Sequence, residues 1–213
     1  MNLLCSPGRG SSMSRSEHWN DVYTRKAATD VSWFQPEATL SLELIRAARL
    51  PPTGPILDVG AGASTLVDGL IADGHSDITL LDIAHSALAT TRSRVGDARV
   101  QYEIGDITTW QAKRSYDLWH DRAVFHFLTS ESDRDAYRTV LSRAVPRGGH
   151  VVIATFADDG PQRCSGLSVQ RYSASELVNE FGSLLSPMDT RRQSHVTPSG
   201  AEQRFVFVRF KRI

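Results

Sequence analysis

The sequence predicts a three-layer α/β fold whose mostly parallel, seven-stranded sheet ends in an antiparallel pair of strands. Short apolar runs alternate with segments of helical periodicity along most of the chain, which is typical of β/α repeats. The last two apolar segments alternate at period two and have no helical pattern between them, which favours a hairpin. The length of 213 residues suits one domain of this kind.

Five apolar segments are the expected parallel strands. They are residues 56–59, 78–82, 100–104, 116–120 and 150–156. Helical spacing between them predicts helices at about 65–72 and 86–95, and a third that begins near Ser130. A Ser173-to-Glu176 capping box opens a further short helix. The closing hairpin pairs a strand within 188–196 with a strand at 204–210.

The amino-terminal region divides into two parts. Residues 1–14 are rich in Gly and Ser, and we expect them to form a disordered leader. Residues 15–213 are expected to form the single domain, whose first helix carries Leu40 and Leu44 on one face and ends before Pro51 and Pro52.

Composition excludes several classes of protein. Lys plus Arg and Asp plus Glu both number 24, so no basic excess indicates a nucleic-acid partner. No apolar run approaches the about 18 residues that span a bilayer, so we expect no membrane partner. Two distant cysteines do not make a disulfide scaffold and fit a reducing, cytoplasmic location. The histidines lack metal-ligand spacing, and no metal site is expected.

The most informative segment runs from Ile56 to Ser64. Gly60 and Gly62 follow a buried strand directly, so the backbone can turn tightly and approach a ligand before the next helix begins. Asp82 ends the following strand, where a carboxylate can accept hydrogen bonds from both hydroxyls of a ribose. This combination predicts a nucleoside cofactor.

Two residues argue against a dinucleotide. Thr65 stands where the dinucleotide fingerprint has its third glycine. Asp58 lies next to the glycine turn, where a carboxylate repels a pyrophosphate but suits a cofactor that carries a cationic amino group.

The segment Asp58-Val59-Gly60-Ala61-Gly62 resembles the first motif of the class I S-adenosylmethionine-dependent methyltransferases. The resemblance extends to Asp82, to Gly105-Asp106-Ile107 and to the terminal strand pair, although Ser64 replaces a glycine that many members have. It implies a Rossmann-like fold and S-adenosyl-L-methionine as cofactor. By this resemblance the cofactor-binding residues are Asp58, Gly60, Ala61 and Gly62 at the methionine part, Asp82 at the ribose, and Ile83, Asp106 and Ile107 at the adenine.

The same resemblance implies where the methyl acceptor binds. Residues just past the fourth strand line the transferred methyl group in similar enzymes, and here they include His120, Asp121, Arg122 and His126. We expect His126, Asp121 or His120 to act as a general base, because an amine or alcohol acceptor must lose a proton. A thiolate or carboxylate acceptor needs less help.

Residues 15–50 resemble the lid and first helix of small methyltransferases. Trp19, Trp33 and Phe34 are therefore expected to cover the cofactor and, with Arg122, to shape the acceptor pocket. Three alternatives to a small-molecule methyltransferase remain open at this point: a protein-lysine methyltransferase, a non-catalytic S-adenosylmethionine-binding module, and a small NAD(P)-dependent oxidoreductase.

Overall fold

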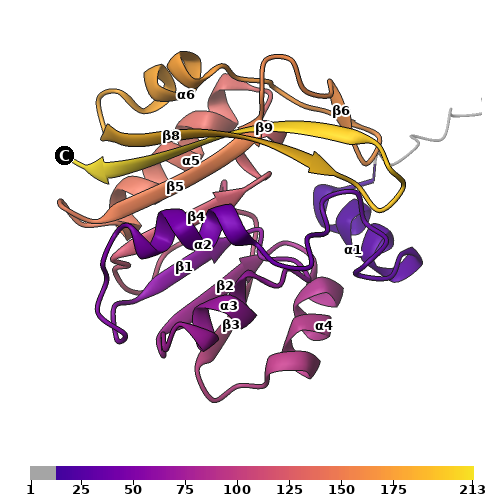
Figure 1. Ribbon diagram of the computed structural model, residues 1–213, viewed down its shortest axis with the longest axis horizontal. Helices are drawn as coiled ribbons and strands as arrows, with labels where there is room; N and C mark the ends of the chain where they lie inside the picture. Colours follow the sequence, from indigo (N-terminus) through magenta and orange to yellow (C-terminus); the bar gives the residue numbers. More distant parts are fainter. Residues whose placement is uncertain (1–12) are drawn as a thin grey trace, which may run out of the picture.

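The computed structural model describes residues 13–213, and its core is one seven-stranded sheet with the order β3-β2-β1-β4-β5-β9-β8 (Figure 1). The strands are β1 Ile56–Val59, β2 Ile78–Asp82, β3 Val100–Ile104, β4 Leu118–Arg122, β5 His150–Phe156, β8 Leu185–Val196 and β9 Glu202–Arg212. Strands β1 to β5 are parallel, and β9 runs antiparallel between β5 and β8. The predicted fold class is confirmed.

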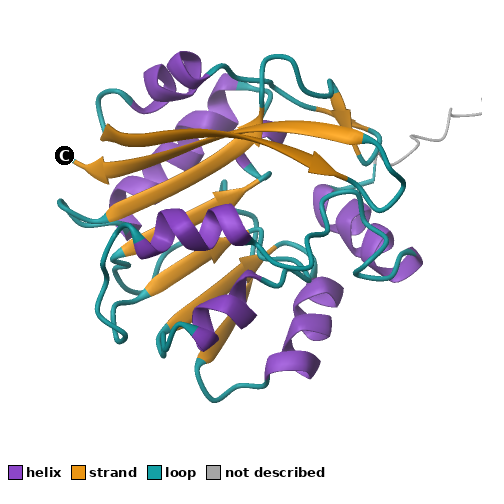
Figure 2. Ribbon diagram, viewed as in Figure 1, coloured by secondary structure: helices purple, strands orange, loops and turns teal. Residues whose placement is uncertain are grey.

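Helices cover both faces of this sheet (Figure 2). They are α1 Arg15–Arg25, α2 Thr39–Arg46, α3 Leu66–Ala72, α4 His85–Val95, the 3-10 helix η1 Phe125–Phe127, α5 Glu131–Ala144 and α6 Ala174–Phe181. Buried side chains of α2, α3 and α4 form one core with the sheet, and those of α5 and α6 form a second core on the opposite face. Helix α1 contributes to neither core and lies near the carboxyl ends of the parallel strands (Figure 1).

Local signals fix several helix ends. Ser173 and Glu176 form the expected capping box of α6, and Ser130 caps α5. Ser14 and Glu17 form a capping box that opens α1. The leader predicted for residues 1–14 therefore lies outside the described residues except for its last two, and the second of these caps a helix.

Strand β4 lies two residues further along the chain than the sequence predicts. Leu118 pairs with Ile56 of β1 and with His150 of β5, and this register carries the strand to Arg122. Tyr116 is buried but comes before the strand, and its N–H donates to the carbonyl of Ala144. Asp121 and Arg122 thus belong to the strand itself, and the alternation of side chains sends them to opposite faces of the sheet.

The two antiparallel strands are longer than their apolar patterns suggest. Strand β8 is at the edge of the sheet and most of its side chains are at least partly exposed, so apolar periodicity marks only part of it. Two further short strands, β6 Arg163–Cys164 and β7 Leu167–Ser168, form a small hairpin that the sequence analysis did not predict.

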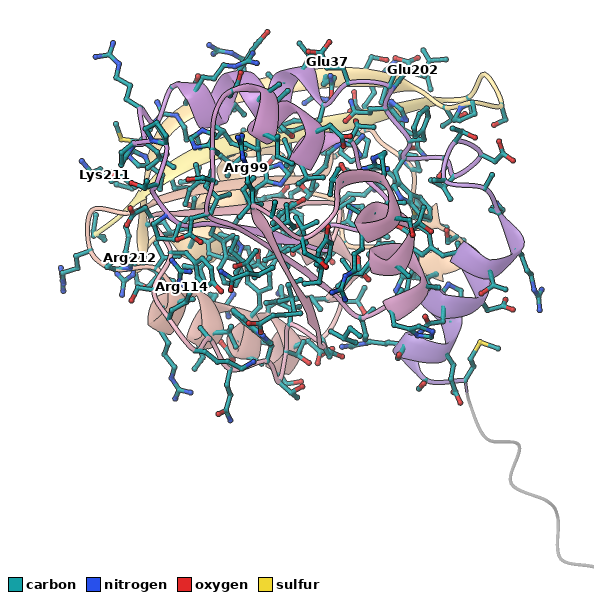
Figure 3. All side chains as sticks on the ribbon, turned by 90° about the horizontal axis from the view of Figure 1, so that it is seen from below. Glu37, Arg99, Arg114, Glu202, Lys211 and Arg212 are labelled. Carbon is teal, nitrogen blue, oxygen red and sulfur yellow. The ribbon has the colours of Figure 1, made fainter. Side chains whose placement is uncertain are left out.

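Charged side chains such as Glu37, Glu202 and Lys211 are exposed and lie around the outline of the molecule (Figure 3). Within residues 13–213, no helix combines the length and the apolar character that crossing a membrane requires.

One buried hydrogen-bond chain ties β4 to α5. Trp119 Nε1 donates to the hydroxyl of Tyr137 over 2.8 Å, and this hydroxyl donates to Asp121 Oδ2 over 2.7 Å. We predict that Tyr137→Phe lowers the free energy of unfolding by about 2–3 kcal/mol, because it leaves a buried indole N–H without a partner. Urea denaturation measures this loss.

Tyr102→Phe is the matched control for that variant. The hydroxyl of Tyr102 donates to the Gly96 carbonyl at an exposed position, so its removal should change stability by about 0.5 kcal/mol or less. Equal losses in the two variants would contradict a special role for the buried chain.

Candidate functional site

A cavity lies along the carboxyl ends of β1, β2 and β4, beneath α1 and the segment that joins α1 to α2. This is the edge at which open α/β sheets bind ligands. Eight of the residues singled out from the sequence line it: Trp19, Trp33, Gly60, Asp82, Ile83, Asp106, Ile107 and Arg122. The remaining seven do not line its wall: Phe34, Asp58, Ala61, Gly62, His120, Asp121 and His126.

The glycine turn after β1 is packed so closely that it admits no side chain. Gly60 has a φ of +65°, and a Cβ placed there would lie 2.0 Å from Val124 Cγ2. Gly62 has a φ of +54°, and its Cβ would lie 2.3 Å from the hydroxyl of Tyr23. Both glycines are therefore required by conformation and by space. The turn touches the loop after β4 on one side and α1 on the other.

Asp82 is the best-positioned polar group of the cavity. Its Oδ2 accepts from the N–H of Gly62 over 2.8 Å, and its Oδ1 accepts from the N–H of Ala84 over 2.7 Å. These bonds fix the orientation of the carboxylate and leave each oxygen a lone pair for another donor. Burial raises the pKa of Asp82 to about 6, and the negative charge of Asp58 contributes in the same direction. The group can accept hydrogen bonds from two adjacent hydroxyls.

The β2–β3 end of the cavity combines apolar and acidic groups. Ile83 and Ile107 contribute apolar surface to the wall. Asp106 lies between β3 and β4, and its Oδ1 accepts hydrogen bonds from the N–H and the hydroxyl of Thr108. Its Oδ2 lies 3.7 Å from Nη1 of Arg15, which comes from α1. This end can hold a flat, mostly apolar group that has a polar edge.

Asp58 points into the protein and not into the cavity. Its Oδ1 lies 2.7 Å from Nδ1 of His120, and Nε2 of His120 lies 2.9 Å from the hydroxyl of Ser41 on α2. All three side chains are buried. The sequence analysis expected Asp58 to border the cofactor and His120 to border the acceptor. The observed geometry differs, because strand alternation directs both side chains under α2.

Asp121 has a comparable supporting place on the opposite face of β4. It accepts from the backbone N–H groups of Val124 and Phe125 as well as from Tyr137. These bonds hold the turn after β4, in which Ala123 has a φ of +72°. Burial raises the pKa of Asp121 to about 6. Contrary to the sequence-based expectation, Asp121 does not line the cavity. Its hydrogen-bond partners Val124, Phe125 and Tyr137 belong to the scaffold.

His126 is also buried and away from the cavity wall. Its Nδ1 accepts from the N–H of Phe156 over 3.2 Å, and its Nε2 has no partner among the described residues. Burial, together with the positive charge of Arg122, lowers the pKa of His126 to about 3. The ring of His126 packs on Phe127 and Phe156. This position does not fit the expected role of His126 as a general base.

Aromatic side chains of the amino-terminal segment close the cavity. Trp19 packs edge-to-face on Trp33 and on Phe127, with ring centroids 5.7 Å and 5.0 Å apart. Trp33 Nε1 donates to the hydroxyl of Tyr23 over 3.2 Å. Phe34 lies outside the lining. Tyr23 belongs to the segment that resembles a lid in sequence; it stands one helical turn after Trp19 and shares its face of α1.

The β4–β5 side of the cavity contains residues that no motif identified. Phe156 ends β5, Cys164 lies in β6 and Phe205 in β9, and all three line the wall with Arg122. Burial raises the pKa of the Cys164 thiol to about 11, so this group is a neutral thiol at physiological pH. Phe156 and Phe205 are brought together by the antiparallel pairing of β5 with β9, and Cys164 comes from the small β6–β7 hairpin that follows β5.

Comparison with known proteins identifies relatives of this chain. A family model described as a methyltransferase domain matches residues 56–149. Human EEF1A lysine methyltransferase 2 is 25% identical over 219 residues, which cover 92% of this chain and 87% of the human protein.

Solved structures share the fold. A SAM-dependent methyltransferase from Anabaena variabilis superposes with a TM-score of 0.73 at 14% identity, covering 95% of this chain and 96% of that one. The 1,6-didemethyltoxoflavin-N1-methyltransferase of Burkholderia thailandensis, solved with 1,6-didemethyltoxoflavin and S-adenosylhomocysteine, superposes with a TM-score of 0.67 at 20% identity, covering 91% of this chain and 82% of that one.

The packing of the glycine turn generates a prediction. Gly60→Ala should lower the free energy of unfolding by about 3 kcal/mol or more, because left-handed backbone strain adds to the clash with Val124. Urea denaturation measures the loss. Gly74→Ala is the control, since Gly74 has a φ of +91° in open space and should lose only about 1 kcal/mol from strain. The double variant Gly60→Ala/Val124→Ala should recover part of the loss, and no recovery would argue against the contact.

Proposed function

We propose that this chain is a class I S-adenosylmethionine-dependent methyltransferase that moves a methyl group from S-adenosylmethionine to a small-molecule acceptor; the match of residues 56–149 to a methyltransferase domain and the shared fold support this. The observation that carries the proposal is Asp82, whose two oxygens are held by the N–H groups of Gly62 and Ala84 at the carboxyl edge of the sheet. A carboxylate fixed in this way is suited to a ribose diol.

The residues present fit the adenosyl group of the cofactor. Asp82 offers free lone pairs to the ribose hydroxyls, and Ile83 and Ile107 offer apolar surface to the adenine, with Asp106 as acceptor for its amino group. The turn at Gly60 brings backbone to the cavity without a side chain in the way. A bound S-adenosylmethionine supplies an activated methyl group on a sulfonium, which becomes a neutral thioether when the methyl leaves.

The chain contributes positioning and exclusion of water. Trp19, Tyr23 and Trp33 cover the cavity from α1 and the segment after it, so closure over both substrates removes solvent from the reacting atoms. The aromatic faces are also suited to a cationic sulfonium, at about 0.5–2 kcal/mol for each well-placed ring. Holding two reactants in line accounts for a large part of such a reaction's acceleration.

The acceptor side of the described cavity wall contains no carboxylate and no imidazole. Cys164 is the neutral titratable group there, and burial raises the pKa of its thiol to about 11. This supports an acceptor that is already nucleophilic at neutral pH, such as a carboxylate, a thiolate or a ring nitrogen, in preference to one that needs a protein base.

A second candidate is methylation of a protein lysine. The likeness to human EEF1A lysine methyltransferase 2 over most of both chains favours it. The two are separated by incubating the protein with isotope-labelled S-adenosylmethionine and either a metabolite extract or extracted proteins, followed by mass spectrometry. We expect label on small molecules. Label confined to protein would support the second candidate.

Affinity for S-adenosylhomocysteine tests the cofactor site directly. Asp82→Asn should weaken binding about 100-fold, because two hydrogen bonds to a charged acceptor are altered. Isothermal titration calorimetry measures the change. Asp68→Asn is the control, since Asp68 pairs with Arg94 on the exposed side of α3 and should bind like the wild type. Wild-type protein that binds NAD(P) and no S-adenosylhomocysteine would overturn the proposal.

The raised pKa of Asp82 predicts a pH dependence of the same affinity. The ionised carboxylate accepts from both hydroxyls, whereas protonation occupies one oxygen. Because the pKa of the free protein is about 6, affinity should rise as pH increases from 5 through 6 and become constant above about 7. Asp82→Asn should lose this dependence. A wild-type profile that is flat between pH 5 and 8 would contradict the assignment.

A further inference from the structure

The side chain of Arg122 is enclosed in the cavity region without an anionic partner. Nη1 donates to the carbonyl of Trp33 over 3.0 Å, and the guanidinium stacks over the ring of Phe205 with 4.6 Å from Cζ to the centroid. Nε and Nη2, which together carry three N–H groups, are buried and have no hydrogen-bond partner among residues 13–213.

No carboxylate of the chain compensates this charge. Within the described part, no Asp or Glu oxygen lies within 4 Å of the Arg122 nitrogens. Residues 1–12 contain neither Asp nor Glu, so they have no acidic side chain to offer. A buried charge that is left unpaired is costly, and proteins keep such a group mainly where a ligand completes it.

The position of Arg122 distinguishes it from the adenosyl end of the site. Asp82 and Asp106 follow β2 and β3, on one side of β1, whereas Arg122 ends β4 and lies beside residues of β5 and β9. Its neighbours in the cavity wall are Phe156, Cys164 and Phe205. The free N–H groups are thus on the side of the site that the proposed function gives to the acceptor.

We propose that Arg122 binds an anionic group, carboxylate or phosphate, of a small acceptor that has an apolar body. This inference rests on the proposed methyltransferase function and names the class of its substrate. The edge formed by Nε and Nη2 is the one with which a guanidinium holds two oxygens of a single anion. The aromatic wall around it excludes a large polar body and accommodates an apolar one.

The fixed plane of the guanidinium supports this role. The Trp33 carbonyl and the Phe205 ring hold Arg122 on two sides, so little rotational freedom is lost when an anion binds to the third. Burial lowers the pKa of Arg122 to about 10, so the group is still cationic at neutral pH. Access requires movement of residues 26–38, the segment that carries Trp33 and contains neither helix nor strand.

Binding of simple probes tests the proposal without knowledge of the natural acceptor. The probes are benzoate, phenyl phosphate and the neutral benzyl alcohol, titrated by calorimetry into protein saturated with S-adenosylhomocysteine. The wild type should bind at least one of the two anions about 10-fold or more tightly than the alcohol. Tighter binding of benzoate assigns a carboxylate, and tighter binding of phenyl phosphate assigns a phosphate.

Variants of Arg122 identify the residue responsible. Arg122→Met should reduce affinity for the preferred anion about 10- to 100-fold, and Arg122→Lys should retain part of it. Neither should change affinity for S-adenosylhomocysteine. Arg209→Met is the matched control, because Arg209 also has a buried, unpartnered Nε but does not line the cavity, and its anion binding should equal that of the wild type.

Stability separates ligand binding from a purely structural role. Removal of an unpaired buried charge should leave the melting temperature of Arg122→Met equal to or above that of the wild type. Three results would overturn the proposal: no preference for anions in the wild type, equal anion binding in Arg122→Met, or loss of S-adenosylhomocysteine binding in Arg122→Met, which would assign the guanidinium to the cofactor's own carboxylate. A wild type that binds no S-adenosylhomocysteine at all would instead remove the proposed function.

Discussion

The hydrogen bond from the Gly62 N–H to Asp82 Oδ2 is the interaction on which the rest of the site depends. It joins the turn after β1 to the end of β2, and it is possible only because Gly60 and Gly62 adopt positive φ values that side chains rarely allow. The same turn carries Gly60 against Val124 and Gly62 against Tyr23. One backbone path therefore sets the distance between three elements: the β2 carboxylate, the loop after β4 and the covering helix α1.

Several polar residues near the site serve the scaffold and not the cavity. Asp58 and His120 form a buried chain with Ser41, and Asp121 holds the turn after β4 through two backbone N–H groups. Buried polar groups of this kind are costly unless they are hydrogen-bonded, and each of these four finds its partners within the protein. The bond between Asp58 and His120 connects β1 to β4, and the bonds of Asp121 connect β4 to the turn after it.

The order of strands and helices could be predicted from sequence because apolar periodicity and capping residues are local signals. The orientation of polar side chains could not. His120, Asp121 and Arg122 are consecutive, and a shift of two residues in the predicted limits of β4 decides whether Asp121 and Arg122 are loop or strand. Once they belong to the strand, alternation sends Asp121 to α5 and the other two to the α2 face. Phe156, Cys164 and Phe205 carry no motif, so only the three-dimensional arrangement reveals them as cavity wall.

The electrostatics of the cavity connect its two ends. A sulfonium bound at the side of Asp82, as proposed, and the guanidinium of Arg122 would be like charges in one cavity, which Trp19, Tyr23 and Trp33 also line. Their repulsion grows as the effective dielectric falls, so closure over the cofactor alone is unfavourable. An anionic acceptor of the proposed class, placed between them, would convert that repulsion into two attractions and would favour closure when both substrates are present. Transfer of the methyl group removes the charge of the sulfonium, and the attraction that held the closed arrangement is then weakened on the side of the cofactor. Under the proposed function, the guanidinium of Arg122, whose Nε and Nη2 are buried, would therefore give the chain a physical means of coupling closure to the arrival of its acceptor.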